Sequence, residues 1–426
     1  MSVVLQRASN RGLDRLARVE VQLGTRRISS FHLCGLAGLV LASSLAMTLS
    51  AYRDLSLWVM GGITGFNLSI FFGLAMSTKI LTGRESLTFY HHQLAILGAT
   101  AVLLRLLHQP WLSYLDITMI GLLAFLSCGR IGCLMAGCCH GRPHRWGVCY
   151  QDAHVVAGFP PYLAGVRLFP VQVFESLWAA CLATAGSILI LYGRLPGEVF
   201  TLSVIAYSSM RFFLEFLRGD PERPYWWDFS EAQWTSLLLC GAVGLAGLAG
   251  LLPLHRWLLV PAAGLPLTVL LITLHRRWTK SRLHLVLHAR HLREFAESLG
   301  WICSLANDEA GGTWKPPAAS AIPTRETSLG IRVSTTCLPG ESGLSYHYAL
   351  SSKDGEMEPG YARVLAQLIL LLKHPGGSGR LIQGKQGVIH LVVKSYPPHP
   401  NAYPLRAVHP GALPQHPGRS RPADPG

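Results

Sequence analysis

The residues best suited to chemistry lie in one segment, from Cys128 to Cys149, which reads CGRIGCLMAGCCHGRPHRWGVC. The segment begins at the end of an apolar run, which places its Arg130 at membrane depth. A charge in that setting costs several kcal/mol unless it is paired, so such a residue is by default a functional candidate. We therefore interpret this segment as the floor of an active site that faces lipid.

Further ionisable side chains fall inside other apolar runs. Arg211 and Glu215 stand four residues apart, on one helix face, where the alternative is an ion pair that only neutralises itself. Glu175 follows Gln172 in a separate run. If these runs share one bundle, the arginines and glutamates predict a polar cavity whose guanidinium groups can bind a phosphate.

Two histidines, His91 and His92, stand at the start of another apolar run. Beside the arginines, a histidine would supply the proton transfer that a reaction at an alcohol or thiol needs near neutral pH. The alternative is a histidine at an interfacial helix end that takes no part in chemistry.

The same segment gathers potential ligands for a soft metal, namely Cys133, Cys138, Cys139, His140 and Cys149. Zinc takes thiolate and imidazole ligands tetrahedrally. Adjacent cysteines depart from the usual C-x-x-C pattern, however. Small residues in a tight turn, or a disulfide if the segment lies outside the cytoplasm, are the alternatives. We expect no metal and no other cofactor.

Composition indicates a membrane protein with several spans and polar ends. Half of the 426 residues are hydrophobic, and only 14% are charged. The net charge of +14 comes mostly from arginines outside the apolar runs, which is typical of positive-inside topology and of contact with membrane lipid. No basic stripe is interleaved with aromatic residues, so we expect no nucleic-acid partner.

The apolar runs must position these residues. Runs long enough to span a membrane occur at 31–50, 55–76, 90–108, 114–136, 170–192, 197–216, 232–252 and 257–274. Pro261 and Pro266 interrupt the last run. We therefore expect an all-α polytopic membrane domain over 31–275, with seven or eight transmembrane helices and a polar head at about 137–169.

The flanking segments have a different character. Residues 1–30 are basic and indicate an interfacial amphipathic segment or a disordered arm. Residues 281–395 predict a small soluble α+β domain, and the tail at 396–426, rich in Pro, Gly, His and Arg, is expected to be disordered. The expected helices and strands of the α+β domain are helices at 283–300 and 360–374 and strands at 328–337, 343–352 and 387–394.

In this order and spacing, the motifs resemble the bacterial prolipoprotein diacylglyceryl transferase family. The resemblance is carried by GRIGCLMAGCCHGR, RLFPVQVFE and AYSSMRFFLEFLRGDP, with weaker echoes in YHHQLAILG and GGITGFNLSIFFG. It implies a multi-pass enzyme of the bacterial cytoplasmic (inner) membrane. Such an enzyme moves a diacylglyceryl group from phosphatidylglycerol to the lipobox cysteine of a prolipoprotein signal peptide and releases glycerol phosphate.

The resemblance also implies roles for individual residues. Arg130 and Arg211 match the family's arginines and would bind the lipid phosphate, while His91 matches its histidine and would serve as general base. His92 is the alternative at that position. The other positions that match the family's substrate site are Gly141, Gln172, Glu175, Tyr207 and Glu215.

The chain departs from the family pattern at several positions. Cys133 stands where the family has asparagine, Cys138 where it has glutamate, and Cys34 where it has tyrosine. His92 and Gln93 replace two glycines. Two other functions therefore stay open: thiol or metal handling at the cysteine cluster, and an inactive transferase-like anchor for the C-terminal domain.

The orientation of the chain has two competing predictions. Basic segments at both ends of eight spans place both tails in the cytoplasm. The family topology instead places the N-terminus and the head on the outer face. With the family topology, we expect the run at 257–274 to be re-entrant or interfacial.

Overall fold

The computed structural model describes residues 3–82, 89–221, 224–279, 283–310, 322–340, 343–353 and 355–394. The chain divides into two compact units. The first comprises the described residues within 1–297, 327–329 and 358–376, and the second those within 298–326, 330–357 and 377–426. The tail expected to be disordered lies outside the described residues.

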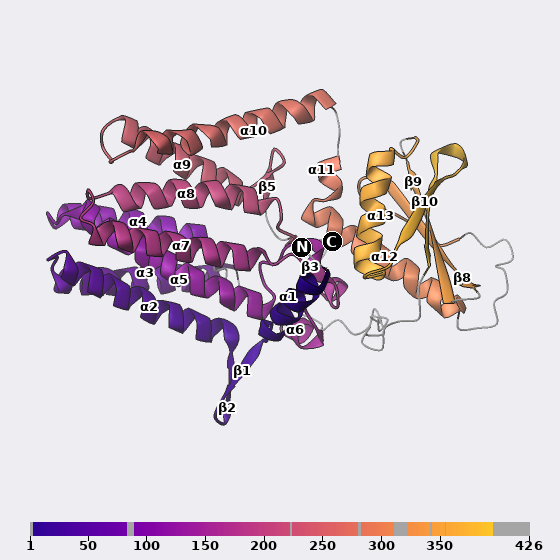
Figure 1. The fold of residues 1–426 in the computed structure, drawn as a ribbon, viewed down its shortest axis with the longest axis horizontal. Helices are drawn as coiled ribbons and strands as arrows, with labels where there is room; N and C mark the ends of the chain where they lie inside the picture. Colours follow the sequence, from indigo (N-terminus) through magenta and orange to yellow (C-terminus); the bar gives the residue numbers. More distant parts are fainter. Residues whose placement is uncertain are drawn as a thin grey trace, which may run out of the picture. The chain divides into compact units, whose positions relative to one another are not determined.

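A bundle of long apolar helices forms the body of the first unit (Figure 1). The helices are α2 Ser30–Tyr52, α3 Leu57–Thr82, α4 Phe89–Leu106, α5 Trp111–Ala136, α7 Val171–Leu191, α8 Glu198–Glu215, α9 Glu231–Leu248 and α10 Leu259–Thr279. Each apolar run predicted from the sequence is therefore confirmed as a helix. By length and composition, five helical segments of the described chain can cross a membrane: α2, α3, α5, α7 and Arg256–Thr279.

The central helix of this bundle is α5, which contacts α2, α4, α7 and α8. Small residues allow α2 to approach it closely, as is common where membrane helices pack. A Cβ added at Gly38 would lie 2.9 Å from the Cβ of Cys128, and one added at Gly132 would lie 3.0 Å from the Cβ of Cys34. This close packing fixes the face of α5 that carries Arg130.

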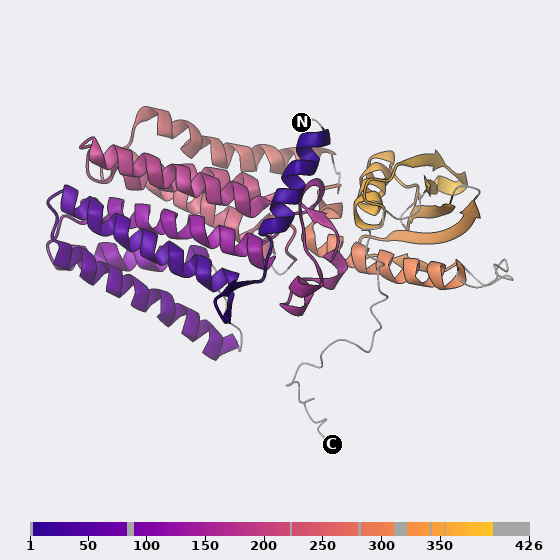
Figure 2. The same cartoon turned by 60° about the horizontal axis from the view of Figure 1, so that its bottom comes forward.

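A small head is attached to one end of the bundle (Figure 2). Its elements are α1 Val3–Leu16, the hairpin of β1 Glu20–Leu23 and β2 Arg26–Ser29, β3 Pro143–Cys149, α6 Asp152–Val156 and β4 Arg167–Leu168, which pairs with β3. Asp14 of α1 accepts two hydrogen bonds of 3.0 Å from Arg167 and one of 2.9 Å from the Cys149 amide. The first half of the N-terminal segment therefore contains a helix that docks on the head.

The last helix of the bundle returns the chain to the head end. A short hairpin, β5 Tyr225–Trp226 with β6 Phe229–Ser230, joins α8 to α9. After α10, the Nε2 atom of His284 in α11 (Leu283–Val286) lies 3.3 Å from Oδ2 of Asp228. The ring of His288 lies 3.9 Å from that of Tyr225. The α10 helix lies beside α8 and α9, and the chain after it contacts the hairpin between them (Figure 1).

The second unit is built on an antiparallel sheet with the strand order β10-β11-β9-β8-β7. Its strands are β7 Thr324–Glu326, β8 Ile331–Gly340, β9 Gly343–Ser352, β10 Gly379–Gln383 and β11 Ile389–Lys394. Alternate residues of β11 are buried, which gives the period of two that predicted this strand. The β7 and β10 strands were not predicted, because both are short and exposed along their whole length.

The helices expected in the C-terminal region are also present. The helix predicted at 283–300 is observed as α11 followed by α12 Ala289–Ala310, and the one predicted at 360–374 as α13 Pro359–Lys373. The α12 helix runs from the first unit into the second, whereas α13 belongs to the first. The described chain is therefore mostly helical, with a β-rich region near its C-terminal end.

Candidate functional site

Charged side chains from three helices meet inside the bundle, near its head end. Arg130 comes from the last two turns of α5, Glu175 from the first two turns of α7, and Arg211 and Glu215 from the end of α8. Their exposed fractions are 8%, 0%, 1% and 2% in that order. Buried charges persist only when they are paired, so their mutual contacts decide what this cluster can do.

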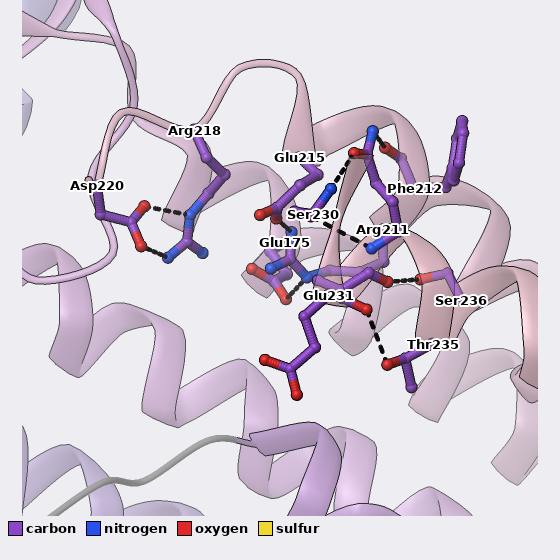
Figure 3. Close-up of polar contacts among 12 residues, drawn as sticks. Glu175, Arg211, Phe212, Glu215, Arg218, Asp220, Ser230, Glu231, Thr235 and Ser236 are labelled. Atoms are coloured by element: carbon purple, nitrogen blue, oxygen red, sulfur yellow. Dashed lines mark hydrogen bonds and ion pairs between the residues drawn. The ribbon is translucent and has the colours of Figure 1, made fainter. Parts of the chain in front are cut away.

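Glu175 is the hub of the cluster, and Figure 3 shows it beside Arg211 and Glu215. Its Oε2 atom lies 2.9 Å from Nε of Arg130, and its Oε1 atom lies 3.5 Å from Nε of Arg211. The Tyr207 hydroxyl donates a 2.7 Å hydrogen bond to Oε1. Arg211 also reaches Glu215, with 2.5 Å between Nη1 and Oε2. The Arg211–Glu215 pair is therefore part of a network that links three helices.

A cavity of about 600 Å³ opens beside this network, between α2, α3, α4 and α5. Its walls are mostly apolar side chains, and Arg130 and Cys133 line it on the α5 side. Nη1 of Arg130 lies 3.9 Å from Sγ of Cys133. Arg130 therefore binds Glu175 through Nε and also borders an apolar space large enough for part of a lipid.

The two adjacent histidines of α4 have different surroundings. The His91 side chain is 58% exposed, and its Nε2 atom lies 2.7 Å from Oε1 of Glu231 on α9. His92 is buried and lines the cavity, with its ring 4.9 Å from that of Phe71. Successive helix residues point about 100° apart, so a shift of one position decides which histidine faces the cavity. The sequence match to His91 rested on spacing and could not resolve this.

Gln172 and Gly141 hold the backbone of the turn that follows α5. Nε2 of Gln172 donates a 2.9 Å hydrogen bond to the Cys138 carbonyl, which ties α7 to the turn after α5. Gly141 forms a β-bridge with Arg218, and a Cβ at this glycine would clash with the Phe169 carbonyl. Within the described part of the chain, neither Gln172 nor Gly141 lines the cavity. Both hold the backbone of the turn.

Arg218 is a buried arginine that the sequence pattern did not single out, because it follows the apolar run instead of lying inside it. It is 1% exposed and forms a two-fold ion pair with Asp220, at 2.8 and 3.0 Å (Figure 3). Its carbonyl accepts a 3.2 Å hydrogen bond from Nε of Arg142. The RGD sequence that begins three residues after the intramembrane Glu215 is the signal that could have identified it.

The cysteine turn follows α5, and its backbone is held from several sides. The Gly137 amide donates to the Cys133 carbonyl at 3.0 Å, and the Gly219 amide donates to the His140 carbonyl at 3.0 Å. Cys139 has a φ of 55°, a left-handed conformation that is uncommon outside glycine and is often found at functional sites.

Three cysteines of this turn come together. The sulfur atoms of Cys133, Cys138 and Cys139 lie within 4.8 Å of one another. Among the described residues, the other two predicted ligands, His140 and Cys149, are not part of this group of three. Nδ1 of His140 contacts the Gly141 carbonyl at 3.0 Å, and the Cys149 thiol accepts from Gln151 at 3.5 Å.

The electrostatics of the turn favour a thiolate at Cys139. Hydrogen bonds from the thiols of Cys133 and Cys138 hold the pKa of Cys139 well below its usual range. The positive charges of Arg218 and Arg130 act in the same direction. A thiolate is the form of cysteine that acts as nucleophile and as metal ligand.

Comparison with known proteins identifies one family. Residues 18–249 match the family model described as prolipoprotein diacylglyceryl transferase. The chain is 36% identical over 131 residues to phosphatidylglycerol–prolipoprotein diacylglyceryl transferase 2 of Clostridium perfringens. The matched residues make up 29% of this chain and 48% of that protein.

Two further relatives bear the name phosphatidylglycerol–prolipoprotein diacylglyceryl transferase. The protein of Clostridium tetani is 36% identical over 131 residues, covering 29% of this chain and 49% of its own length. A protein of Dehalococcoides mccartyi is 32% identical over 143 residues, covering 32% and 52%. The chain thus spans about half the length of the curated relatives that it matches.

Proposed function

The chain belongs to the prolipoprotein diacylglyceryl transferase family, and from that premise we propose that it moves a diacylglyceryl group from phosphatidylglycerol to the cysteine thiol of a prolipoprotein signal peptide. The observation that carries the proposal is the position of Arg130. This arginine belongs to a buried ion-pair network and also lines an apolar cavity. A lipid with an anionic headgroup needs a cation for its phosphate and an adjoining apolar space for its acyl chains.

The cavity suits the lipid donor. Its apolar walls favour acyl chains, since burying each CH₂ group is worth about 0.8 kcal/mol. The Arg130 guanidinium is a planar fork of donors that matches a phosphate. Glu175 fixes this fork at 2.9 Å, and Tyr207 in turn fixes Glu175 at 2.7 Å. Donors held in place before the reaction stabilise charge that develops on a leaving phosphate.

The proposed reaction is a substitution at a glyceryl carbon. The acceptor thiol loses its proton, its sulfur forms a bond to the carbon that carries the phosphate ester, and the carbon–oxygen bond breaks. Glycerol phosphate leaves with the bonding electrons. We assign the proton transfer to His92, because it is buried in the cavity wall while His91 is paired with Glu231.

A transfer assay separates the two histidines. Purified protein in vesicles of phosphatidylglycerol would be incubated with a lipobox peptide, and mass spectrometry would follow diacylglyceryl addition to its cysteine. Loss of a general base lowers rates about 10²–10⁴-fold, which we expect for His92→Gln. His91→Gln, the matched control, should retain transfer. The reverse pattern would return the base role to His91. Vesicles of phosphatidylethanolamine should support no transfer.

We propose that this multi-pass protein crosses the bacterial inner membrane eight times. The support is the course of α10, which contacts α8 and α9 and is followed by the contact of His284 with Asp228 at the head end. Eight crossings put the N-terminus, the head and the segment after Thr279 on one membrane face. Epitope tags placed before Val3 and directly after Thr279 test this in intact cells. Protease access to only one of the two tags would contradict eight crossings.

A further inference from the structure

We propose that Cys133, Cys138 and Cys139 form a binding site for a thiophilic cation such as Zn²⁺, with three thiolate ligands and an open fourth position. Membership of the family implies no metal in this chain. At the positions of Cys133 and Cys138, the family has asparagine and glutamate. The metal site itself is independent of the transferase activity. Its role in catalysis, described below, rests on the proposed function.

The geometry of the three sulfurs fits such an ion. A tetrahedral zinc with Zn–S bonds of about 2.3 Å places its sulfur ligands about 3.8 Å apart. The sulfurs of this cluster already lie within 4.8 Å of one another. Small side-chain rotations would close the remaining distance, so no rearrangement of the backbone is needed.

The charge around the cluster also favours three thiolates with a divalent cation. Three thiolates and Zn²⁺ carry a net charge of −1, which needs a positive neighbour in buried surroundings. Arg130 supplies such a neighbour, because its Nη1 atom lies 3.9 Å from the Cys133 sulfur. Thiolate ligands select soft cations such as zinc over magnesium or calcium.

The turn is held in place as a ligand loop would be. Gln172 on α7 fixes the Cys138 carbonyl, and the Gly219 amide fixes that of His140. The left-handed backbone of Cys139 lets two adjacent residues direct their sulfurs to the same point as Cys133. Such strain persists only where surrounding contacts enforce it.

The fourth position gives the ion a role in the transfer. Structural zinc sites have four protein ligands, whereas catalytic sites keep one position for water or substrate. The described residues supply three, and Cys138 is exposed, so an incoming thiol can reach the ion. A thiol that coordinates zinc is deprotonated outright.

Transfer from the lipid to the metal-bound thiol needs no further reactant. The acceptor thiol gives its proton to His92 as it binds the ion. Its sulfur then forms the bond to the glyceryl carbon while the carbon–oxygen bond to phosphate breaks. The product thioether is neutral and a weaker ligand, so it leaves the site. Cys133 lines the lipid cavity, which brings the bound sulfur close to the donor.

Metal analysis of the purified full-length protein tests the site. The protein would be purified anaerobically in detergent with reductant and without chelators, and zinc, copper and iron would be measured by mass spectrometry. We expect stoichiometric zinc in the wild type and its loss to background in Cys138→Ser and Cys139→Ser. Cys181→Ser, which changes an exposed cysteine on α7, is the matched control and should keep the zinc.

Cobalt substitution gives a second readout that does not depend on activity. Co²⁺ added to metal-free wild type should produce thiolate-to-cobalt absorption, which Cys139→Ser should lack. Zinc that is absent from the wild type, or that persists in both serine variants, would overturn the site. A disulfide among the three cysteines in the anaerobic protein would overturn it as well.

The peptide-transfer assay distinguishes failure of the metal proposal from failure of the transferase proposal. Bound zinc with no diacylglyceryl transfer supports the metal site and overturns its catalytic role together with the transferase proposal. Transfer that is undiminished in zinc-free Cys138→Ser overturns the catalytic role of the ion and leaves both the metal site and the transferase proposal intact.

Discussion

Replacing Glu175 with glutamine removes the central charge of the buried network without changing the size of the side chain. Glutamine can still accept the Tyr207 hydrogen bond. Arg211 keeps a carboxylate partner in Glu215, at 2.5 Å. Arg130 loses its 2.9 Å carboxylate partner while it remains only 8% exposed. The network changes from neutral to a net charge of +1.

The size of the effect follows from burial. Removing one partner of a buried ion pair costs about 3–5 kcal/mol, because the remaining charge is left without compensation. Glu231→Gln is the matched control. Its pair with His91 is as short, at 2.7 Å, but the two side chains are 31% and 58% exposed. An exposed pair of this kind contributes about 0–1 kcal/mol.

The free energy of unfolding in mixed detergent micelles would be measured for both variants and the wild type. A third variant, Glu175→Gln with Arg130→Met, removes the uncompensated cation and should regain much of the lost stability. Glu175→Gln that is no less stable than Glu231→Gln would refute the idea that Glu175 compensates buried arginines. A double variant less stable than Glu175→Gln alone would refute it too.

Two further predictions concern the head end. Gly141→Ala should destabilise the protein by about 1–3 kcal/mol, because the new Cβ meets the Phe169 carbonyl. Gly241→Ala, which has open space at this point, should change stability by less than about 0.5 kcal/mol. Burial lowers the pKa of His288 from 6.5 to about 4, so the folded protein favours its neutral form. Its contribution is complete above pH 6.5 and is lost as pH falls towards 4. His288→Asn should therefore lose less stability than wild type between pH 7 and pH 5, by about 1 kcal/mol. Equal losses in the two proteins would contradict this.

The bundle was predictable because its signal is strong and local. A membrane helix needs about 20 apolar residues, and each such run in this sequence is a helix. The meeting of Arg130, Glu175 and Arg211 was also predictable, because charges at membrane depth must find one another. The short exposed strand β7 carries too few residues for any period to be visible.

The finer features of the site depend on the directions in which side chains point, and the spacing of residues in the sequence does not give these directions. His91 and His92 differ by one step along a helix, and that step places only His92 among the residues lining the cavity. The sulfur of Cys139 lies close to that of Cys133 because the Cys139 backbone is left-handed, and no sequence pattern predicts this conformation. Arg218 is buried by a bridge to Gly141 across 77 positions, a contact that only the folded chain creates.

The most direct measurement is diacylglyceryl transfer from phosphatidylglycerol to a lipobox peptide by wild type, Arg130→Ala and Arg130→Lys. Loss of one preorganised donor to a developing anion lowers rates about 10²–10³-fold, which we expect for alanine. Lysine keeps the charge but not the two-pronged fork, and should recover only part of the rate. Arg105→Ala, which changes an arginine that contacts Trp111 outside the network, should transfer normally. Wild-type transfer by folded Arg130→Ala protein would contradict the proposed site.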